Sequence, residues 1–151
     1  MKILAIDPGP LNSAFVLWDT ESHDLLDKDI INSNELIHAL GGNRWSFDLC
    51  AIEMVQSYGM GVGKSIFETC LKVGQMLERL RFHKDSQVKM YGRPSIKGQI
   101  GGRNDTEIRS SLRMRYGDAR KGEKLEGVKK DIWAALALAV ALEENTNLKE
   151  W

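Results

Sequence analysis

Three carboxylates stand at positions where a folded chain could bring them together. Asp7 follows the apolar run ILAI, Glu53 follows the apolar run LCAI, and Asp131 precedes a helix rich in Ala and Leu. If the two apolar runs form neighbouring strands, Asp7 and Glu53 project from the same edge of the sheet. Two carboxylates about 4 Å apart repel by about 4 kcal/mol at an effective dielectric constant of about 20. Three of them at one edge would take up protons or hold a hard cation, Mg²⁺ or Mn²⁺.

Each of these residues also has a purely structural interpretation. Asp7 could cap the Asp-Pro-Gly turn that it opens, Glu53 could pair with an arginine, and Asp131 could be an ordinary helix cap. The metal hypothesis therefore depends on all three meeting at one point. A divalent ion held there would bind a phosphodiester oxygen, activate a water molecule and stabilise the leaving oxygen. That chemistry predicts a nuclease.

The charge distribution is compatible with a polyanionic partner. The formal net charge of the 151 residues is zero, but residues 1–80 carry 6 Lys and Arg against 11 Asp and Glu. Residues 81–131 carry 14 Lys and Arg against 7 Asp and Glu. A basic half of this kind can attract nucleic acid. Ordinary solvated helix faces would give the same count, so charge alone does not decide.

A glycine-rich segment, GMGVGKS at residues 59–65, raises the question of nucleotide binding. A P-loop requires Gly, four residues, then Gly-Lys-Ser/Thr, and the position of its first glycine is Tyr58 here. The dinucleotide pattern G-x-G-x-x-G also fails, because position 64 is Lys. We therefore expect no nucleotide cofactor. An actin-like ATPase fragment is likewise disfavoured, because the chain is too short to close a two-lobed nucleotide cleft.

The elements that would position these residues can be read from periodicity and turn residues. Strands are expected over residues 2–6, 13–18 and 24–31 as an antiparallel meander, then over 49–52 and 87–91. Helices are expected over 34–40, 64–83, 105–116 and 131–144, with a turn or short helix opening at Pro94 and an N-cap at Asn104 or Asp105. The segment 117–130 is polar. This order predicts one mixed α/β domain spanning residues 1–151.

The ordered motifs resemble those of a known family. AIDPGPLNSAFVLWD, LCAIEMVQSYG with GKSIFETCLKVGQ, GRPSIKGQIGG and KKDIWAALALAVAL look like the successive motifs of RuvC-type Holliday junction resolvases, in particular the short phage-encoded branch such as that of lactococcal phages. The resemblance implies an RNase H-like fold, a homodimer, and metal-dependent paired nicking of four-way DNA junctions that leaves 5′-phosphates and 3′-hydroxyls. It also implies that Asp7, Glu53 and Asp131 are catalytic metal ligands, with Mg²⁺ as cofactor and Mn²⁺ as a substitute. Forks are a further expected substrate.

Two departures from the family pattern stand out. Many members carry a second Asp three residues after the position of Asp131, and this chain has Ala134 there. Water, or one of three carboxylates in the 117–130 segment, could replace it: Asp118, Glu123 or Glu126. Bacterial relatives also carry a junction-wedging aromatic three residues after the position of Glu53, where this chain has Gln56 and the nearest aromatic is Tyr58.

The resemblance also gives the glycine-rich segment and the basic half a role. We expect Tyr58 to stack on a base and Lys64 to meet a phosphate, with a plain surface turn as the alternative. Lys97 matches a basic position on the family's DNA-binding side. Exposed surface is the alternative for each of the expected phosphate contacts, which are Arg93, Lys97, Arg103, Lys121, Lys124, Lys129 and Lys130.

Other classes of protein are less compatible with the sequence. No apolar run is long enough to span a membrane, and no signal-peptide pattern opens the chain, so a cytoplasmic protein is expected, in the host if phage-encoded. Cys50 and Cys70 are expected as buried thiols, and no zinc pattern is present. The apolar stripe over residues 66–80 is either a dimer face or core. The main alternative to an enzyme is a non-cutting protein that binds branched nucleic acid, which Ala134 favours.

Overall fold

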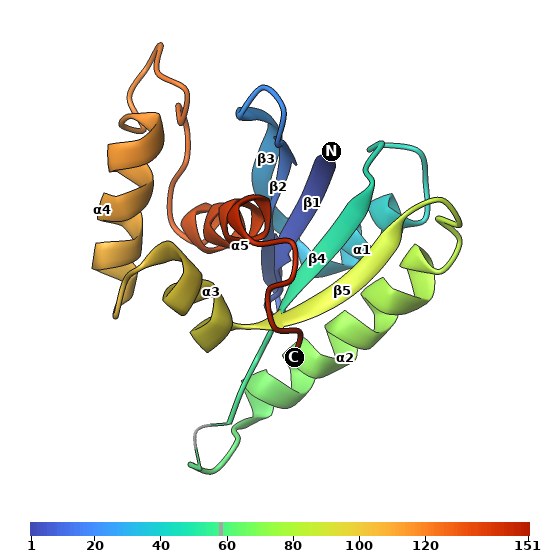
Figure 1. The fold of residues 1–151 in the computed structure, drawn as a ribbon. Helices are drawn as coiled ribbons and strands as arrows, with labels where there is room; N and C mark the ends of the chain where they lie inside the picture. The colour runs from blue at the N-terminus through green and yellow to red at the C-terminus, as the bar shows by residue number, and fades with distance from the viewer. Residues whose placement is uncertain (58) are drawn as a thin grey trace.

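The computed structural model describes residues 1–57 and 59–151. A five-stranded sheet of order β3-β2-β1-β4-β5 lies between two layers of helices (Figure 1). Helices α1 (Ser33–Leu40) and α2 (Lys64–Leu80) pack on each other over one face. Helix α5 (Ile132–Glu144) crosses the other face, and α3 (Arg93–Ile100) and α4 (Asp105–Tyr116) lie beside α5. This is the mixed α/β architecture that the sequence predicts.

The sheet combines an antiparallel meander with two parallel strands, as expected. The strands β1 (Lys2–Asp7), β2 (Asn12–Asp19) and β3 (Asp24–Asn32) are antiparallel neighbours. The strand β4 (Leu49–Met54) then runs parallel to β1, and β5 (Gln87–Gly92) runs parallel to β4. The carboxyl ends of β1, β4 and β5 therefore meet at one edge, as parallel strands require.

Each face of the sheet has its own hydrophobic core. Ile3 and Ala5 of β1 pack toward α5, whereas Leu4 and Ile6 pack toward α1 and α2. Every residue of α5 from Ile132 to Leu142 except Ala134 is buried, which explains why its sequence is apolar on all sides. No helix in the described part of the chain is long and apolar enough to cross a membrane.

The turn after β1 is held by two buried serines. Ser13 and Ser33 hydrogen-bond each other at 2.8 Å; Gly9 N donates to Ser13 Oγ at 3.2 Å, and Ser33 Oγ donates to Gly9 O at 2.8 Å. A Cβ at Gly9 would stand 2.2 Å from the carbonyl oxygen of Asn12, so only glycine fits this tight return. These contacts fix the end of β1, where Asp7 lies.

Several local expectations need correction. Helix α2 ends at Leu80 rather than at residue 83, and Cys70, expected to be buried, is exposed. Phe67, expected in the same apolar stripe, is 60% exposed, because Val73, Met76 and Leu80 form the face that packs on the sheet. Pro94 opens the full helix α3, and the side chain of Asn104 caps α4 by accepting a hydrogen bond from Glu107 N.

The end of the chain returns to the sheet edge formed by β5. Glu150 makes an antiparallel bridge with Tyr91, and Trp151 N donates to Met90 O at 2.8 Å. A second contact joins the Lys89 Nζ and Glu150 Oε1 atoms at 2.9 Å. The outer edge of β5 is thus partly covered by the chain itself.

Candidate functional site

Asp7 and Glu53 lie on neighbouring strands and on the same face of the sheet. The parallel register pairs Ile6 with Ile52, so the next residues along are Asp7 and Glu53. Because side chains alternate along a strand, both carboxylates point to the face on which Ile3, Ala5 and Ala51 pack against α5. Neighbouring strands are about 4.8 Å apart, which brings two carboxylates within reach of one ion. Their adjacency agrees with the sequence prediction.

Asp131 approaches this pair from α5. It is the N-cap of that helix, but its side chain makes no capping hydrogen bond, so its carboxylate is not used in the way an ordinary cap is used. The charge of Asp131 acts on both Asp7 and Glu53. The three carboxylates therefore share one electrostatic environment, although they come from three separate parts of the chain.

Burial and mutual repulsion disfavour the charged forms of the two strand carboxylates. Burial, followed by the charges of Glu53 and Asp131, raises the pKa of Asp7 to about 8. Burial also raises the pKa of Glu53, whose residue exposure is 6%, although the charge of Arg93 partly opposes this shift. Carboxyl groups perturbed in this way are typical of functional sites.

An arginine joins the site from the start of α3. Arg93 Nη1 lies 3.1 Å from Glu53 Oε1, and Arg93 Nη2 lies 3.1 Å from Asp105 Oδ1 at the first turn of α4. Lys97 Nζ approaches the same Asp105 oxygen at 3.4 Å. Although partial burial opposes it, the charges of Arg93 and Lys97 hold the pKa of Asp105 below its usual value. The structural alternative for Glu53, an arginine partner, is thus present.

The donor set suits a hard divalent cation by its chemistry, because carboxylate oxygens are the ligands that Mg²⁺ and Mn²⁺ prefer. In residues 1–57 and 59–151, however, no three His, Cys, Asp or Glu side chains come close enough to hold a metal ion as they stand. The guanidinium of Arg93 contacts one oxygen of Glu53, Oε1. A metal ion at Glu53 would therefore compete with Arg93 for this carboxylate.

A small polar cavity of about 40 Å³ adjoins the carboxylates. It is bounded by the ends of α3, α4 and α5, and its lining residues are Arg93, Asp105, Ile108, Arg109, Lys130, Asp131, Trp133 and Ala134. The position at which many resolvases carry a second Asp therefore opens onto a space lined by three cationic side chains. The sequence does not predict Arg109 here; its Nε atom is buried and has no hydrogen-bond partner among the residues that the structure describes. Only tertiary packing reveals it, since α4 carries three arginines of similar sequence context.

The acidic residues proposed to replace the missing Asp make contacts within their own segment and with the end of α4. Asp118 pairs with Arg113 and Arg120, Glu123 accepts from Asp118 N, and Glu126 accepts from Gly122 N. Asp105 is the additional carboxylate whose charge acts on Asp7 and Glu53. From the sequence, Asp105 is predicted only as a possible N-cap of a helix.

The expected phosphate contacts fall into two groups. The first group lies near the carboxylates. Arg93 and Lys97 contact Glu53 or Asp105, and Lys130 lines the adjoining cavity together with Arg93. Lys129 precedes Lys130 in the chain, and Arg103 is almost fully exposed near the start of α4. Lys124 instead contacts Asp24 at 3.3 Å and Ser22 O at 3.1 Å, at the turn between β2 and β3. That turn lies at the opposite end of β1 from Asp7 (Figure 1). Lys121 is exposed in the same segment as Lys124.

The glycine-rich segment lies between β4 and α2, after Glu53. Tyr58 lies outside the described residues, and Lys64 is exposed and pairs with Glu68 at 3.5 Å. Gln56 packs against the backbone of Gly92, where an added Cβ would stand 2.3 Å from its Nε2 atom. The residue at the family's wedge position is therefore turned toward β5.

Comparison with protein-family models and with curated proteins gives no match. Among solved structures, RuvC of Thermus thermophilus is similar over 100% of both chains, with a TM-score of 0.75 at 17% sequence identity. The T. thermophilus RuvC in complex with a Holliday junction substrate is similar over 100% of this chain and 99% of that one, with a TM-score of 0.69 at 18% identity. The five-stranded sheet and its flanking helices thus form the RNase H-like fold of RuvC.

Proposed function

We propose that this protein is a metal-dependent endonuclease that resolves Holliday junctions and related branched DNA by paired nicking. The observation that carries the proposal is the placement of Asp7, Glu53 and Asp131 around one end of a RuvC-fold sheet. The similar T. thermophilus protein has a structure with a Holliday junction substrate. The basic side chains beside the carboxylates supply the charge complementarity that such a substrate needs.

The chain's own residues would divide the work as follows. Asp7, Glu53 and Asp131 would hold Mg²⁺, or Mn²⁺ in its place, and the bound ion would supply Lewis-acid activation of the phosphate and of the attacking water. Lys97, Arg93 and Lys130 would bind the phosphates on either side of the cut. The serine-tethered turn after β1 would keep Asp7 in place while DNA binds. The buried site would exclude bulk water and strengthen each charge interaction.

Cleavage of a labelled four-way junction in Mg²⁺ tests this proposal. We expect Asp7→Asn to slow cleavage about a thousandfold or more while junction affinity in a gel shift stays the same, because the basic surface is intact. Asp85→Asn, at an exposed carboxylate beyond α2, is the matched control and should cleave normally. Normal nicking by Asp7→Asn would refute the assignment.

A non-cutting protein that binds branched nucleic acid is the second candidate. Ala134 and the ion pair between Arg93 and Glu53 favour it, since both reduce the acidic character of the site. Junction binding without products in Mg²⁺, Mn²⁺ or Ca²⁺ would support this candidate over the enzyme.

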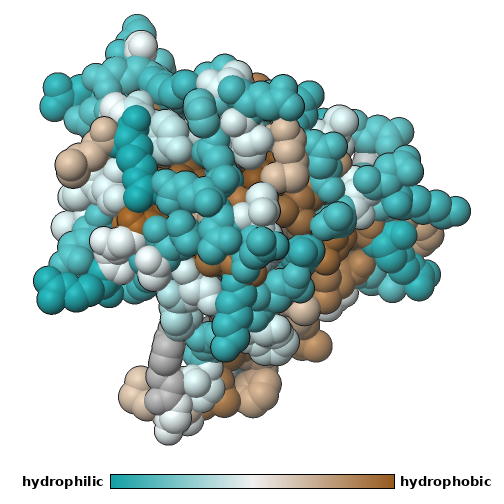
Figure 2. All heavy atoms as spheres, viewed as in Figure 1, coloured by the Kyte–Doolittle hydropathy of each residue, from teal (hydrophilic) through white to brown (hydrophobic). Residues whose placement is uncertain are grey.

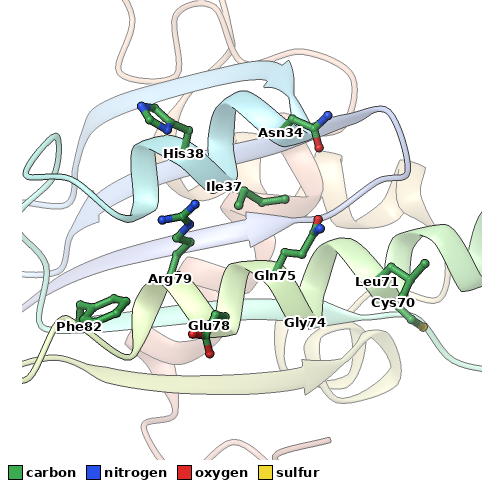
Figure 3. A pocket seen from close by; sticks show the side chains of 10 residues that line it. All are labelled: Asn34, Ile37, His38, Cys70, Leu71, Gly74, Gln75, Glu78, Arg79 and Phe82. Atoms are coloured by element: carbon green, nitrogen blue, oxygen red, sulfur yellow. The ribbon is translucent and has the colours of Figure 1, made fainter.

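A homodimer is part of the proposal, because paired nicks require two sites related by symmetry. The stripe expected over residues 66–80 is divided between two faces of α2: Val73, Met76 and Leu80 face the sheet, whereas Phe67 and Leu71 are exposed. Between α1 and α2 lies a groove of about 870 Å³, lined by Ile37, Leu71, Gly74 and Phe82 among others (Figure 3). We assign this outer face of α2 to a second copy of the chain.

A further inference from the structure

Arg93 connects the candidate metal ligands with the surface expected to bind DNA. Its two terminal nitrogens contact different carboxylates, Glu53 on β4 and Asp105 on α4, each at 3.1 Å. Glu53 is nearly buried, whereas the Arg93 side chain is 36% exposed and Asp105 is 57% exposed. The guanidinium therefore enters the site from the solvent side and closes it.

A guanidinium and a divalent ion compete for the same carboxylate. Arg93 uses one oxygen of Glu53, Oε1, and a divalent cation needs direct contact with oxygen lone pairs of the same group. Both carry positive charge, so they repel each other at this short range. An ion at Glu53 therefore weakens the hold of Glu53 on Arg93, and Arg93 opposes entry of the ion.

The structure also offers a place for the released side chain. Arg93 borders the cavity of about 40 Å³ that Arg109 and Lys130 line with it, next to Asp131 and Ala134. Three cationic side chains around one small cavity favour an anionic group there, and the partnerless Arg109 Nε supplies an unused donor. A DNA phosphate presented at this cavity would give Arg93 a new bidentate partner.

We propose that Arg93 is a positioning residue that exchanges partners: it holds Glu53 and Asp105 in the free protein and turns to a DNA phosphate when the metal ion binds Glu53. The proposal rests on the proposed function. Metal and DNA binding then support each other, because the metal ion frees Arg93 for the phosphate and the phosphate draws Arg93 away from Glu53. Metal loading would be favoured on substrate and disfavoured without it.

The test is a titration of the protein with Mn²⁺ in the absence of DNA, at about pH 8.5 under anaerobic conditions. The electron paramagnetic resonance signal of free Mn²⁺ measures how much of the ion is bound. Arg93→Gln removes the competing cation, so we expect it to bind Mn²⁺ about fivefold more tightly than the wild type. Arg93→Lys should be intermediate, because an ammonium group cannot bridge two carboxylates as a fork does. In junction cleavage at saturating Mg²⁺, Arg93→Gln should be at least about tenfold slower, because its phosphate contact is lost.

Arg93→Gln is thus expected to bind Mn²⁺ more tightly but to cleave more slowly. If Arg93 had only a structural role, the same substitution would weaken both metal binding and cleavage. Arg81→Gln is the control for loss of one positive charge; Arg81 pairs with Glu78 at the end of α2 and should leave Mn²⁺ affinity within twofold of wild type. Mn²⁺ binding by Arg93→Gln that is equal to or weaker than that of the wild type overturns the exchange.

If Arg93→Gln does not fold by circular dichroism, Arg93→Lys carries the same test. A wild-type measurement is also available: saturating Mg²⁺ should shift the Nε–Hε resonance of Arg93 toward that of a solvated arginine, and an unchanged resonance overturns the exchange. Because the titrations contain no DNA, they decide the exchange even if the wild type does not cut junctions.

Discussion

Asp7 is held partly buried against two other carboxylates, and this makes the protein's stability depend on pH. Its pKa is about 8 in the folded protein, far above the value of 3.8 for an unperturbed aspartate. The folded state therefore binds more protons than the unfolded chain between these two values. The contribution of Asp7 to stability is therefore full below about pH 4 and is lost as the pH rises through about 8.

Replacing Asp7 should remove much of this dependence. In EDTA, we expect the wild type to lose of the order of 2 kcal/mol of stability between about pH 5 and pH 9, and Asp7→Asn to lose clearly less. Mg²⁺ should stabilise the wild type more at the higher pH, because the ligand must be deprotonated. Thermal unfolding at several pH values measures both effects. Parallel curves for the two proteins would contradict the role given to Asp7.

The strand carboxylates could be predicted from sequence, but their partners could not. Asp7 and Glu53 each end a short apolar run, a local signal that needs only the alternation of a strand to be interpreted. Arg93 and Asp105 meet Glu53 only because α3 and α4 fold back across the end of the sheet. No local pattern marks Arg109 among the arginines of α4. Helical spacing alone also does not separate the exposed Phe67 from Val73, Met76 and Leu80, which are buried in the same stripe.

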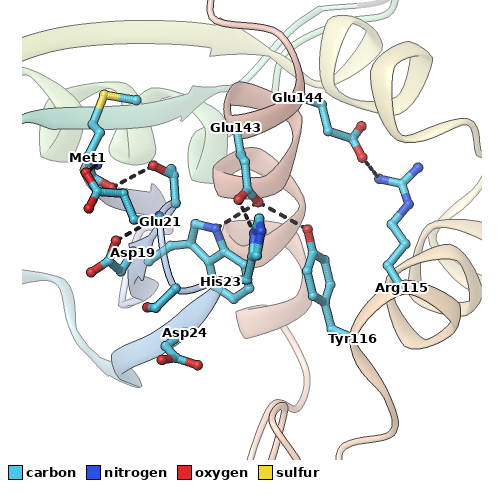
Figure 4. Close-up of polar contacts among 12 residues, drawn as sticks. Met1, Asp19, Glu21, His23, Asp24, Arg115, Tyr116, Glu143 and Glu144 are labelled. Carbon is cyan, nitrogen blue, oxygen red and sulfur yellow. Dashed lines mark hydrogen bonds and ion pairs between the residues drawn. The ribbon is translucent and has the colours of Figure 1, made fainter.

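At the scale of elements, the far end of α5 is fixed by a single carboxylate. Glu143 accepts hydrogen bonds from Trp18 Nε1 at 3.0 Å and from the Tyr116 hydroxyl at 3.1 Å, and it contacts His23 Nδ1 (Figure 4). Burial and the charge of Glu143 raise the pKa of Tyr116. One side chain of α5 thus connects β2, the following turn and α4, opposite the end of α5 at which Asp131 lies.

We expect Glu143→Ala to destabilise the protein by about 2 to 4 kcal/mol, because it leaves the buried Trp18 Nε1 and the partly buried Tyr116 hydroxyl without an acceptor. The neighbouring Glu144→Ala is the matched control. Glu144 contacts Arg115 with both side chains about one-third exposed, so its loss should cost about 1 kcal/mol or less. Urea unfolding of the two variants measures the difference. Equal losses would mean that Glu143 does not connect these elements in the way described.

For the whole molecule, exposed apolar side chains are more concentrated along α2 and its end than over α4, where Met114 is exposed. Hydrophilic side chains cover α4 and the segment after it (Figure 2), whereas Phe67, Leu71 and Phe82 are exposed along α2 and its end. Exposed apolar side chains gathered on one helix are typical of an association surface. In the proposed function, the face around α3 and α4 would bind DNA while α2 would meet a second copy.

Leu71→Glu should therefore weaken the dimer, because the substitution places a charge at the centre of the proposed interface. We expect its dimer dissociation constant to rise at least about tenfold, measured by sedimentation velocity, and its junction cleavage to yield single nicks in place of paired ones. Met114→Glu, on the exposed side of α4, is the control and should remain dimeric. A wild-type monomer at high concentration would contradict the assignment of α2.

The return of Glu150 and Trp151 to β5 limits how copies of this protein can assemble. Main-chain groups at Met90 and Tyr91 on that edge of the sheet already have partners within the same molecule. The opposite edge, β3, presents Asp24, Asp27, Lys28 and Asp29. A strand from another molecule would meet paired main-chain groups at the β5 edge and charged side chains at the β3 edge, which disfavours fibril-like strand pairing. Copies are left to recognise one another by side-chain packing, which is reversible and can be tuned by single substitutions.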